Sequence, residues 1–289
     1  MCPALRRCLK IARVRPAPLL ALLALGACRQ RAASDAHASL TAGAATTAAT
    51  AAAAPGAAND SIVPRAPRGV PADRFPAPTR PVASIVSPRW SNEDDRDDAG
   101  EPERVFRAAG IAAGTRVADI GAGDGYYAVR VAPRVGPTGL VYAQDIEARY
   151  LALLQRRLRE RPQPNVVLAL GEPHDPRLPA ASADVALLIH MYHEIEQPFG
   201  LLYNLYPALR PGARVVILDT TRPTSRHGTP PALLRCELRA MGYRETAFDA
   251  YAADEYVAVF APPATAAELT APGAVAGRLA ALGCDRAAR

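Results

Sequence analysis

The fold of this chain is decided by the stretch Val117-Ala118-Asp119-Ile120-Gly121-Ala122-Gly123-Asp124-Gly125. Its first half is a short apolar run of the kind that forms a buried strand, and its second half has glycine at every second position. Glycine lets the backbone approach a ligand closely, and ligands of open α/β sheets bind at the carboxyl ends of the strands. The stretch therefore predicts a strand, a ligand-binding turn and a following helix.

Strand and helix signals alternate along the chain around this turn. Apolar runs predict strands at residues 116–120, 139–144, 165–170, 183–189 and 213–218. Leucines at helical spacing predict a helix that stops before Pro162, and Thr229, as a cap followed by two prolines, begins another that ends at Gly242. The segments 243–248 and 255–260 predict an antiparallel pair. This order predicts an α/β domain with a parallel sheet covered on both faces.

The spacing of the glycines distinguishes two kinds of nucleotide-binding turn. A dinucleotide fingerprint needs G-x-G-x-x-G, but the residue three positions after Gly123 is Tyr126. The observed pattern is D-x-G-x-G-x-G, formed by Asp119, Gly121, Gly123 and Gly125. This pattern resembles motif I of the class I S-adenosylmethionine-dependent methyltransferases.

Further landmarks of that family follow in the same order, and the resemblance covers residues 101–261. Asp145 ends the second predicted strand, and the acidic turn Gly171-Glu172 follows the third. The other segments that resemble the family are Arg177-Leu178-Pro179, Met191-Tyr192-His193-Glu194 and Leu209-Arg210-Pro211-Gly212-Ala213-Arg214. In the last of these, Ala213 stands where the family has a second glycine. Each motif alone is weak, but their common order favours the family.

The resemblance implies a Rossmann-like three-layer sandwich, whose mostly parallel seven-stranded sheet has an antiparallel last strand. It implies S-adenosyl-L-methionine as the cofactor, with Asp145 on the ribose hydroxyls and Glu172 near the adenine amine. The remaining cofactor-binding residues that it implies are Asp119, Gly121, Gly123 and Gly125. The reaction would be methyl transfer to a small-molecule acceptor by in-line displacement, in which alignment and desolvation supply much of the acceleration.

The segment after the fourth strand carries the candidate catalytic residues. His193 is the first candidate for a general base, which is needed only if the acceptor is a protonated oxygen or nitrogen, and Tyr192 flanks it. Lining of the pocket and a purely structural role are the alternatives for His193. The order of His190, His193 and Glu194 differs from the helical histidine pair of zinc proteases, so the sequence predicts no metal site.

Three other features leave alternatives open. Pro207 predicts a kinked or shortened helix before the fifth strand, and Asp124 can cap the helix after the glycine turn. The acidic run 93–98 predicts a solvated surface. In the resembling family this segment forms a lid over the cofactor, in which case Trp90 and Arg96 line the acceptor pocket.

The N-terminal residues have the pattern of an export signal. Five basic residues and no acidic ones precede an apolar run that ends in Leu25-Gly26-Ala27-Cys28, which resembles a bacterial lipobox. We expect a signal at 1–27 and acylation of Cys28, hence an exported lipoprotein that faces the periplasm. A plain secretory signal, a twin-arginine signal at Arg6-Arg7 and a misassigned start, which would leave the protein cytoplasmic, are the alternatives.

The remaining boundaries follow from composition. An Ala/Thr- and Pro-rich segment at 28–88 predicts a disordered tether, residues 89–263 the methyltransferase domain, and residues 264–289 an Ala-rich tail with a possible helix. Cys236 and Cys284 remain as a possible pair, which the sequence does not decide.

The charge of the chain lies mostly in its first residues. The formal net charge is +6, and removal of residues 1–27 leaves +1. The sequence therefore predicts no nucleic-acid partner and membrane contact only through the lipid on Cys28. An exported enzyme lacks an obvious cofactor supply, so the alternative function is a non-catalytic binding module for an adenosyl or nucleoside-like ligand.

Overall fold

The computed structural model describes residues 61–85 and 92–287. The predicted signal, the acylation of Cys28 and the predicted role of Trp90 lie outside the described residues. No helix in the described ranges combines the length and the apolar character that crossing a membrane requires.

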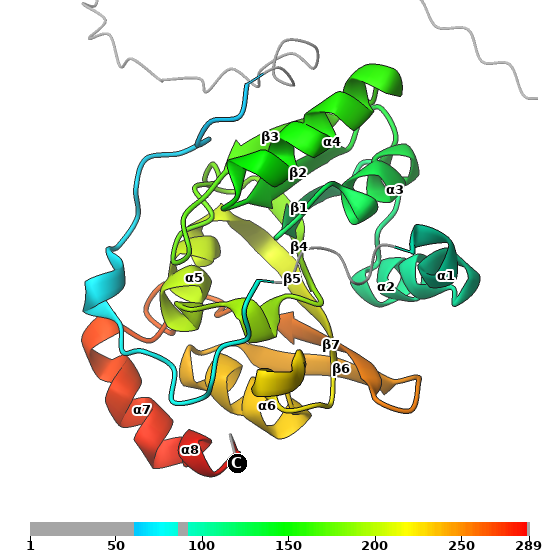
Figure 1. The fold of residues 1–289 in the computed structure, drawn as a ribbon. Helices are drawn as coiled ribbons and strands as arrows, with labels where there is room; N and C mark the ends of the chain where they lie inside the picture. Colours follow the sequence, from blue (N-terminus) through cyan, green and yellow to red (C-terminus); the bar gives the residue numbers. More distant parts are fainter. Residues whose placement is uncertain (1–60, 86–91, 288–289) are drawn as a thin grey trace, which may run out of the picture. The chain divides into compact units, whose positions relative to one another are not determined.

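The described part of the chain contains one seven-stranded sheet (Figure 1). Its strands are β1 (Arg116–Ile120), β2 (Leu140–Asp145), β3 (Val166–Leu170), β4 (Ala183–Ile189), β5 (Leu209–Thr220), β6 (Arg244–Ala250) and β7 (Glu255–Ala261). The order is β3-β2-β1-β4-β5-β7-β6, and β7 runs antiparallel to the other six strands. The predicted Rossmann-like sheet is therefore confirmed, although β5 begins at Leu209 rather than at residue 213.

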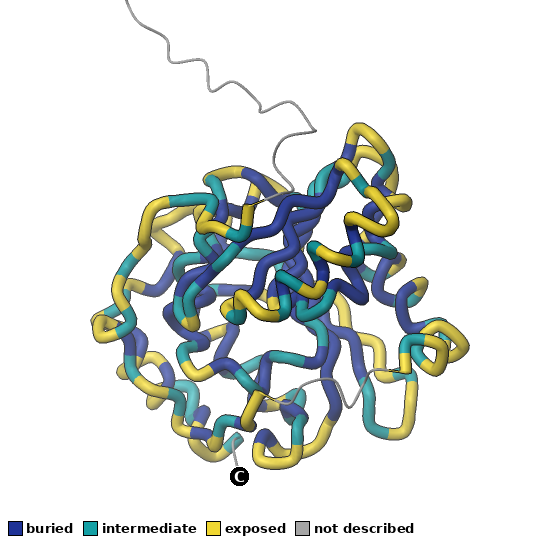
Figure 2. The backbone as a smooth tube through the Cα atoms, turned by 45° about the horizontal axis from the view of Figure 1, so that its top comes forward, coloured by how far each residue is buried: buried dark blue, intermediate teal, exposed yellow. Residues whose placement is uncertain are grey.

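Helices cover both faces of the sheet because alternate strand residues point to opposite sides. Ala118 and Ile120 belong to one apolar cluster, whereas Val117 belongs to the other. The second cluster contains residues of α2 (Glu101–Ala109), α3 (Tyr126–Val135) and α4 (Ala148–Glu160). The first contains residues of α5 (Pro198–Leu205), α6 (Pro231–Ala240), α7 (Val275–Leu282) and α8 (Cys284–Ala287). The central strands are consequently buried along most of their length (Figure 2).

Short elements complete the fold around these layers. They are α1 (Glu93–Asp98) and the 3₁₀ helices η1 (Ala72–Arg74), η2 (Tyr192–Glu194), η3 (Tyr206–Ala208), η4 (Thr224–Arg226) and η5 (Pro272–Ala274). As Pro207 predicted, α5 stops at Leu205 and a 3₁₀ turn carries the chain into β5.

Two predicted helix caps are wrong. Gly125, with a left-handed φ of 93°, precedes α3, and no side chain of that turn caps the helix, so Asp124 does not act as a cap. Pro230 precedes α6, also without a side-chain cap. The Thr229 hydroxyl instead donates to the Asp219 carboxylate at 2.7 Å. Thr229 thus supports a buried carboxylate rather than the helix.

Residues 61–85 lie against the domain, whereas the sequence predicted a disordered tether up to residue 88. Phe75 belongs to the first apolar cluster, Ala83 is buried, and Arg80 is only 4% exposed. The Arg80 guanidinium donates to the Glu237 carboxylate of α6 at 3.1 Å. The proline content misled the prediction, because an extended segment can be held by side-chain contacts without forming a helix or a strand.

The C-terminal residues extend the layer that contains α6. The predicted single tail helix is two helices, α7 and α8. Cys236 of α6 and Cys284 of α8 form a disulfide bond, which answers the question that the sequence left open. This bond links the tail to the helix that carries Glu237.

Candidate active site

A pocket of about 410 Å³ opens at the carboxyl ends of β1, β2 and β4. Its walls come from Ile85 and Arg96 and from residues in the ranges 120–126, 144–153, 172–173, 189–191 and 194–201. Strand order reverses at β1, which has β2 on one side and β4 on the other. The pocket thus lies at the switch point where open α/β sheets bind their ligands.

The three glycines of the turn have different structural roles. All three have left-handed φ angles, of 70° at Gly121, 58° at Gly123 and 93° at Gly125. A Cβ at Gly125 would lie 2.3 Å from a Leu154 methyl group, whereas a Cβ at Gly123 would meet no atom within 4 Å. Gly125 therefore allows the turn to pack on α4, and Gly123 leaves space open beside the pocket.

Asp145 joins the ends of β1 and β2 and lines the pocket. One carboxylate oxygen accepts a hydrogen bond from the Gly123 amide at 2.8 Å, and the other accepts one from the Glu147 amide at 2.8 Å. Burial raises the pKa of Asp145, against the lowering effect of these hydrogen bonds. Each oxygen keeps a further lone pair, so this carboxylate can also accept bonds from ligand hydroxyls.

Asp119 lies in β1, two residues before the glycine turn begins, and is 3% exposed. Its Oδ2 atom has no hydrogen-bond partner among the described residues. Burial and the charge of Asp145 raise the pKa of Asp119 to about 7. A buried acceptor without a partner is costly, so a donating group beside it would be stabilising, although Asp119 itself does not line the pocket.

Glu172 is at the pocket edge, where its carboxylate is paired with two arginines. Arg68 donates to it at 3.0 Å and Arg177 at 2.7 Å. Burial opposes ionisation, but the two arginines outweigh it and lower the pKa of Glu172. Of the six predicted cofactor residues, Gly121, Gly123, Asp145 and Glu172 line the pocket, whereas Asp119 and Gly125 do not.

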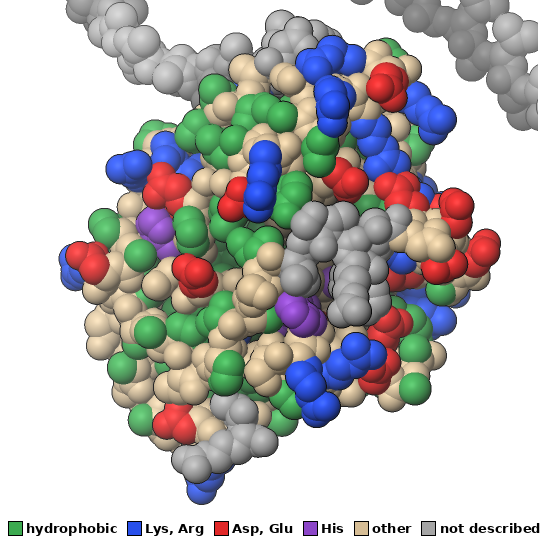
Figure 3. Space-filling view, viewed as in Figure 1, with side chains coloured by type: hydrophobic (Ala, Val, Ile, Leu, Met, Phe, Trp, Pro, Cys, Tyr) green, Lys and Arg blue, Asp and Glu red, His purple; other side chains and the backbone are tan. Residues whose placement is uncertain are grey.

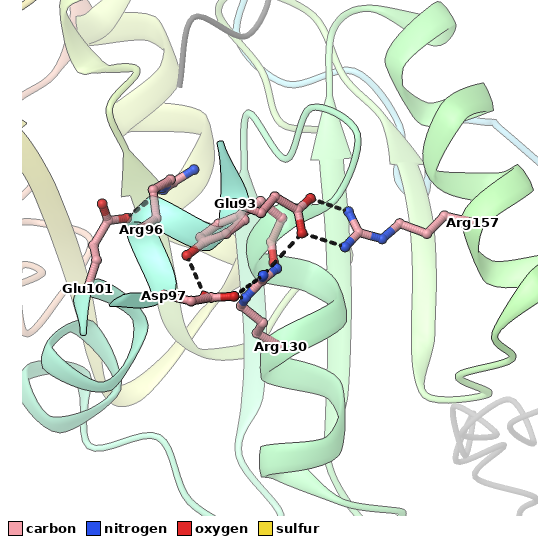
Figure 4. Close-up of polar contacts among 7 residues, drawn as sticks. Glu93, Arg96, Asp97, Glu101, Arg130 and Arg157 are labelled. Atoms are coloured by element: carbon pink, nitrogen blue, oxygen red, sulfur yellow. Dashed lines mark hydrogen bonds and ion pairs between the residues drawn. The ribbon is translucent and has the colours of Figure 1, made fainter. Parts of the chain in front are cut away.

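The acidic run forms α1 and is fastened to the domain by ion pairs (Figure 4). Arg157 of α4 donates two hydrogen bonds to the Glu93 carboxylate, at 2.6 and 2.8 Å. Arg130 of α3 is paired with both Glu93 and Asp97. Part of the run is therefore bound rather than merely solvated, and α1 brings Arg96 to the pocket wall.

Arg96 belongs to a buried polar group beside the pocket. The Glu101 carboxylate accepts hydrogen bonds from Arg96 at 3.1 Å and from Tyr127 at 2.7 Å, and His190 lies 3.3 Å from it. Burial opposes ionisation of Glu101, but His190 and Arg96 outweigh it and lower its pKa to about 2. His190, which lines the pocket, has a left-handed φ of 54°, a strained conformation typical of functional sites.

Neither predicted catalytic residue is among those that line the pocket. Tyr192 is fully buried and donates its hydroxyl hydrogen bond to Glu237 at 2.9 Å. His193 is 1% exposed, and its Nδ1 atom lies 3.0 Å from Asp219. This placement supports a positioning role for Tyr192 rather than contact with a substrate. Glu194, the next residue, does line the pocket.

Sequence patterns missed the side chains that hold this segment. Arg80 donates to the backbone carbonyls of His193 and Tyr192 at 3.4 and 3.2 Å, and to Glu237. Asp219, at the end of β5, is fully buried behind His193. These partners are far apart in the sequence and form no spacing motif. The sequence signal that could have pointed to Asp219 was its charge directly after the predicted buried strand 213–218.

Comparison with known proteins gives one family and several distant relatives. A family model described as "Methyltransferase domain" matches residues 118–215. A demethylmenaquinone methyltransferase of Geobacillus sp. is 25% identical over 122 residues, which are 42% of this chain and 52% of that protein. A 2-phytyl-1,4-naphtoquinone methyltransferase of Nostoc sp. is 29% identical over 152 residues, or 51% of this chain and 66% of that one. The chain spans about half to two thirds of the length of the curated relatives it matches.

Among solved structures, the fold is similar to that of a SAM-dependent methyltransferase from Aquifex aeolicus. The TM-score is 0.54 at 22% identity, and the match covers 61% of this chain and 98% of that one. The matched region, 118–215, contains most of β1, the glycine turn, Asp145, Glu172 and the Tyr192–Glu194 segment. The likeness therefore covers the part of the fold that builds the pocket.

Proposed function

We propose that this chain is a class I S-adenosylmethionine-dependent methyltransferase that acts on a small-molecule acceptor by in-line displacement. The observation that carries the proposal is the pocket at the switch point, in which Asp145 ties the glycine turn to the end of β2. The match of residues 118–215 to a methyltransferase domain supports it.

The donor set fits the proposed cofactor. When bound, that cofactor supplies an electrophilic methyl group on a sulfonium. Asp145 would accept hydrogen bonds from the ribose hydroxyls, and the partnerless oxygen of Asp119 would favour the ammonium, directly or through water. Glu172 would lie near the adenine amine, and the space beside Gly123 would let the cofactor approach the backbone.

The charges that line the pocket also favour a cationic ligand. Six carboxylates contribute to the described lining and only one guanidinium, that of Arg96; the acidic residues are Asp124, Asp145, Glu147, Glu172, Glu194 and Glu196. A pocket with this excess of carboxylates attracts a sulfonium and an ammonium and repels a pyrophosphate. This difference supports S-adenosylmethionine over a dinucleotide.

The acceptor that the pocket fits best has an apolar portion. Of the five large hydrophobic side chains exposed in the described part of the chain, three line this pocket: Ile85, Ile146 and Leu153. Ile146 directly follows Asp145 and so lies on the cofactor side, whereas Ile85, from the N-terminal segment, offers an apolar surface to the acceptor. The names of the matched relatives, which are quinone methyltransferases, support an apolar ring as the acceptor.

We also propose that the enzyme is exported and anchored through a lipid on Cys28. The basic leader, the apolar run and the Leu25-Gly26-Ala27-Cys28 sequence support this location. Side chains of both signs are interspersed on the face shown in Figure 3, without a wide basic stripe. Mass spectrometry of the membrane fraction tests the anchor: we expect a lipid-modified N-terminal cysteine, and an unmodified Met1 would contradict it.

Calorimetry of the full chain with S-adenosylmethionine and S-adenosylhomocysteine tests the function. We expect sub-millimolar binding of both, and Asp145→Ala should weaken it more than 100-fold, because two charge-assisted bonds contribute about 1.5–3 kcal/mol each. Asp184→Ala, at the opposite end of β4, is the matched control and should bind normally. Absence of binding would overturn the proposal. Binding without methyl transfer to any quinone-like acceptor would favour the non-catalytic binding module.

A further inference from the structure

A histidine and carboxylate cluster lies beside the pocket, on the acceptor side. It consists of His193 and Glu194 of η2 and His227, which follows η4. The His193 Nε2 atom is 3.9 Å from Glu194 Oε1, and the His227 Nδ1 atom is 4.0 Å from the same oxygen. One ligand atom from each of the three residues lies within 4.8 Å of the others.

Asp219 orients the first histidine of this cluster. His193 Nδ1 is 3.0 and 3.1 Å from the two oxygens of Asp219, which also accepts hydrogen bonds from the Thr229 hydroxyl and the Thr220 amide. A carboxylate accepts and does not donate when ionised, so the proton of a neutral His193 is on Nδ1. The lone pair of Nε2 then faces Glu194 and His227. Metal-binding histidines commonly have such a carboxylate behind them.

His227 reaches the cluster from a tightly held loop. Its backbone has a left-handed φ of 55°, and its carbonyl oxygen accepts a hydrogen bond from the Thr220 hydroxyl at 3.1 Å. A Cβ at the next residue, Gly228, would lie 2.2 Å from that same hydroxyl oxygen, so the close approach requires glycine. The His227 Nδ1 atom is buried and has no hydrogen-bond partner in the described ranges.

We propose that His193 Nε2, the Glu194 carboxylate and His227 Nδ1 bind a divalent transition-metal ion such as Zn²⁺. Two imidazoles and a carboxylate form a donor set that first-row divalent ions prefer. The negative charges of Glu194 and Asp219 match the charge of the ion. Tetrahedral coordination places ligand atoms about 3.4 Å apart, so the two separations to Glu194, 3.9 and 4.0 Å, need to close by about 0.5 Å.

Three features distinguish a metal site from a pair of histidine rings that only pack against each other. The His193 and His227 rings meet edge to face, with centroids 5.5 Å apart, which alone explains their packing. Ring packing does not require a fully buried Asp219 behind His193. It also does not require the left-handed backbone of His227, or a buried His227 Nδ1 atom without a hydrogen-bond partner among the described residues. The sequence predicted no metal because the third ligand comes from a loop after β5, distant from the His193-Glu194 pair.

The ion would have a coordination position open toward the pocket, because three protein ligands leave the fourth position of a tetrahedral site free. Glu194 is both a ligand of the proposed ion and a pocket-lining residue. We assign the open position to an oxygen atom of the acceptor, such as a phenolic or enolic one. This second step rests on the proposed methyl transfer, whereas metal binding itself does not.

Titration of the chelator-treated full chain with Zn²⁺, without cofactor, tests the metal site. We expect one Zn²⁺ ion to bind per chain with micromolar or tighter affinity. The zinc affinity should be at least 100-fold weaker in His227→Ala and in Glu194→Gln. These two side chains are partly exposed, so their loss should leave the fold intact. His174→Ala, which removes a histidine paired with Glu172 instead, should bind as the unaltered chain does.

Cobalt gives a second readout, because the visible absorption of bound Co²⁺ reports its coordination. We expect a tetrahedral or five-coordinate spectrum that disappears in His227→Ala and shifts when an oxygen-bearing acceptor is added. Equal zinc affinity in the unaltered chain, His227→Ala and Glu194→Gln would overturn the proposal, as would the absence of binding. Cofactor binding is measured separately, so failure of the metal site and failure of the proposed methyl transfer give different results.

Discussion

The two sides of the pocket are built in different ways. On the cofactor side, the Gly123 amide reaches Asp145, 22 positions away, and β1, which precedes the glycine turn, and β2, which ends at Asp145, are parallel neighbours. On the acceptor side, Arg80 reaches Glu237, 157 positions away, and also holds the carbonyls of Tyr192 and His193. The cofactor side therefore depends on backbone geometry, and the acceptor side on buried side-chain contacts between distant segments.

The largest effect we predict is on the acceptor side. Replacing Arg80 with methionine leaves the buried Glu237 carboxylate without its cation and should lower the free energy of unfolding by about 3–5 kcal/mol. Both side chains of this pair are at most 1% exposed. Chemical denaturation measures the loss. Arg210→Met is the control, because its pair with Asp184 is 46% and 35% exposed and should contribute less than about 1 kcal/mol.

If Arg80→Met costs no more than Arg210→Met, the acceptor side does not depend on this pair. The double variant Arg80→Met/Glu237→Met sharpens the comparison. It removes the unpaired charge, so it should recover part of the loss but not all of it, because the carbonyls of Tyr192 and His193 still lack their donor.

This difference explains what the sequence could predict. Asp119, the three glycines and Asp145 lie at fixed spacings because each lies at or just after the carboxyl end of a strand, and Gly121, Gly123 and Asp145 line the pocket. The seven-stranded, mostly parallel sheet was implied by the resemblance to the methyltransferase family. Arg80, Asp219 and His227 follow no spacing, since long-range packing brings them together, and the proline-rich segment that carries Arg80 was predicted to be disordered.

The second prediction concerns Asp119 on the cofactor side. Burial raises its pKa from 3.8 to about 7, so the folded state binds a proton that the unfolded state has lost between these pH values. Stability should therefore fall as the pH rises from about 4 to 7 and stay constant above that. Asp119→Asn removes the titration. The variant should become progressively more stable than the unaltered chain up to pH 7, with a total gain of up to about 4 kcal/mol.

Urea denaturation without cofactor at several pH values between 5 and 8 measures this difference. If the free energy of unfolding changes with pH in the same way in both proteins, the raised pKa of Asp119 is contradicted. Asp119→Asn should also bind S-adenosylmethionine more weakly. A variant that is more stable but binds the cofactor less well would indicate that Asp119 serves ligand binding rather than stability.

The third prediction concerns the disulfide bond, which fastens the C-terminal helices to α6, next to Glu237. Cys236 and Cys284 are 48 positions apart, and closing a loop of that length stabilises the fold by about 2–4 kcal/mol. We expect Cys284→Ser to lower the free energy of unfolding by this amount and to leave cofactor affinity unchanged, because the pocket lining does not include either cysteine. Loss of cofactor binding at temperatures where the variant is folded would contradict this separation of the two sides.

The smallest effect should come from the ion pairs of α1. Glu93 and Asp97 are partly exposed, so each pair contributes only about 0.2–1 kcal/mol and is screened by salt. Because α1 brings Arg96 to the pocket, Arg157→Ala should weaken S-adenosylmethionine binding about two- to fivefold at low ionic strength, and this difference should vanish in about 1 M salt. Calorimetry at the two salt concentrations measures it, with Arg104→Ala as the control, since its pair with Asp249 does not line the pocket. If Arg157→Ala weakens cofactor binding equally in about 1 M salt, charge attraction is not what holds α1. This part of the cofactor side would then depend on buried side-chain contacts, as the acceptor side does.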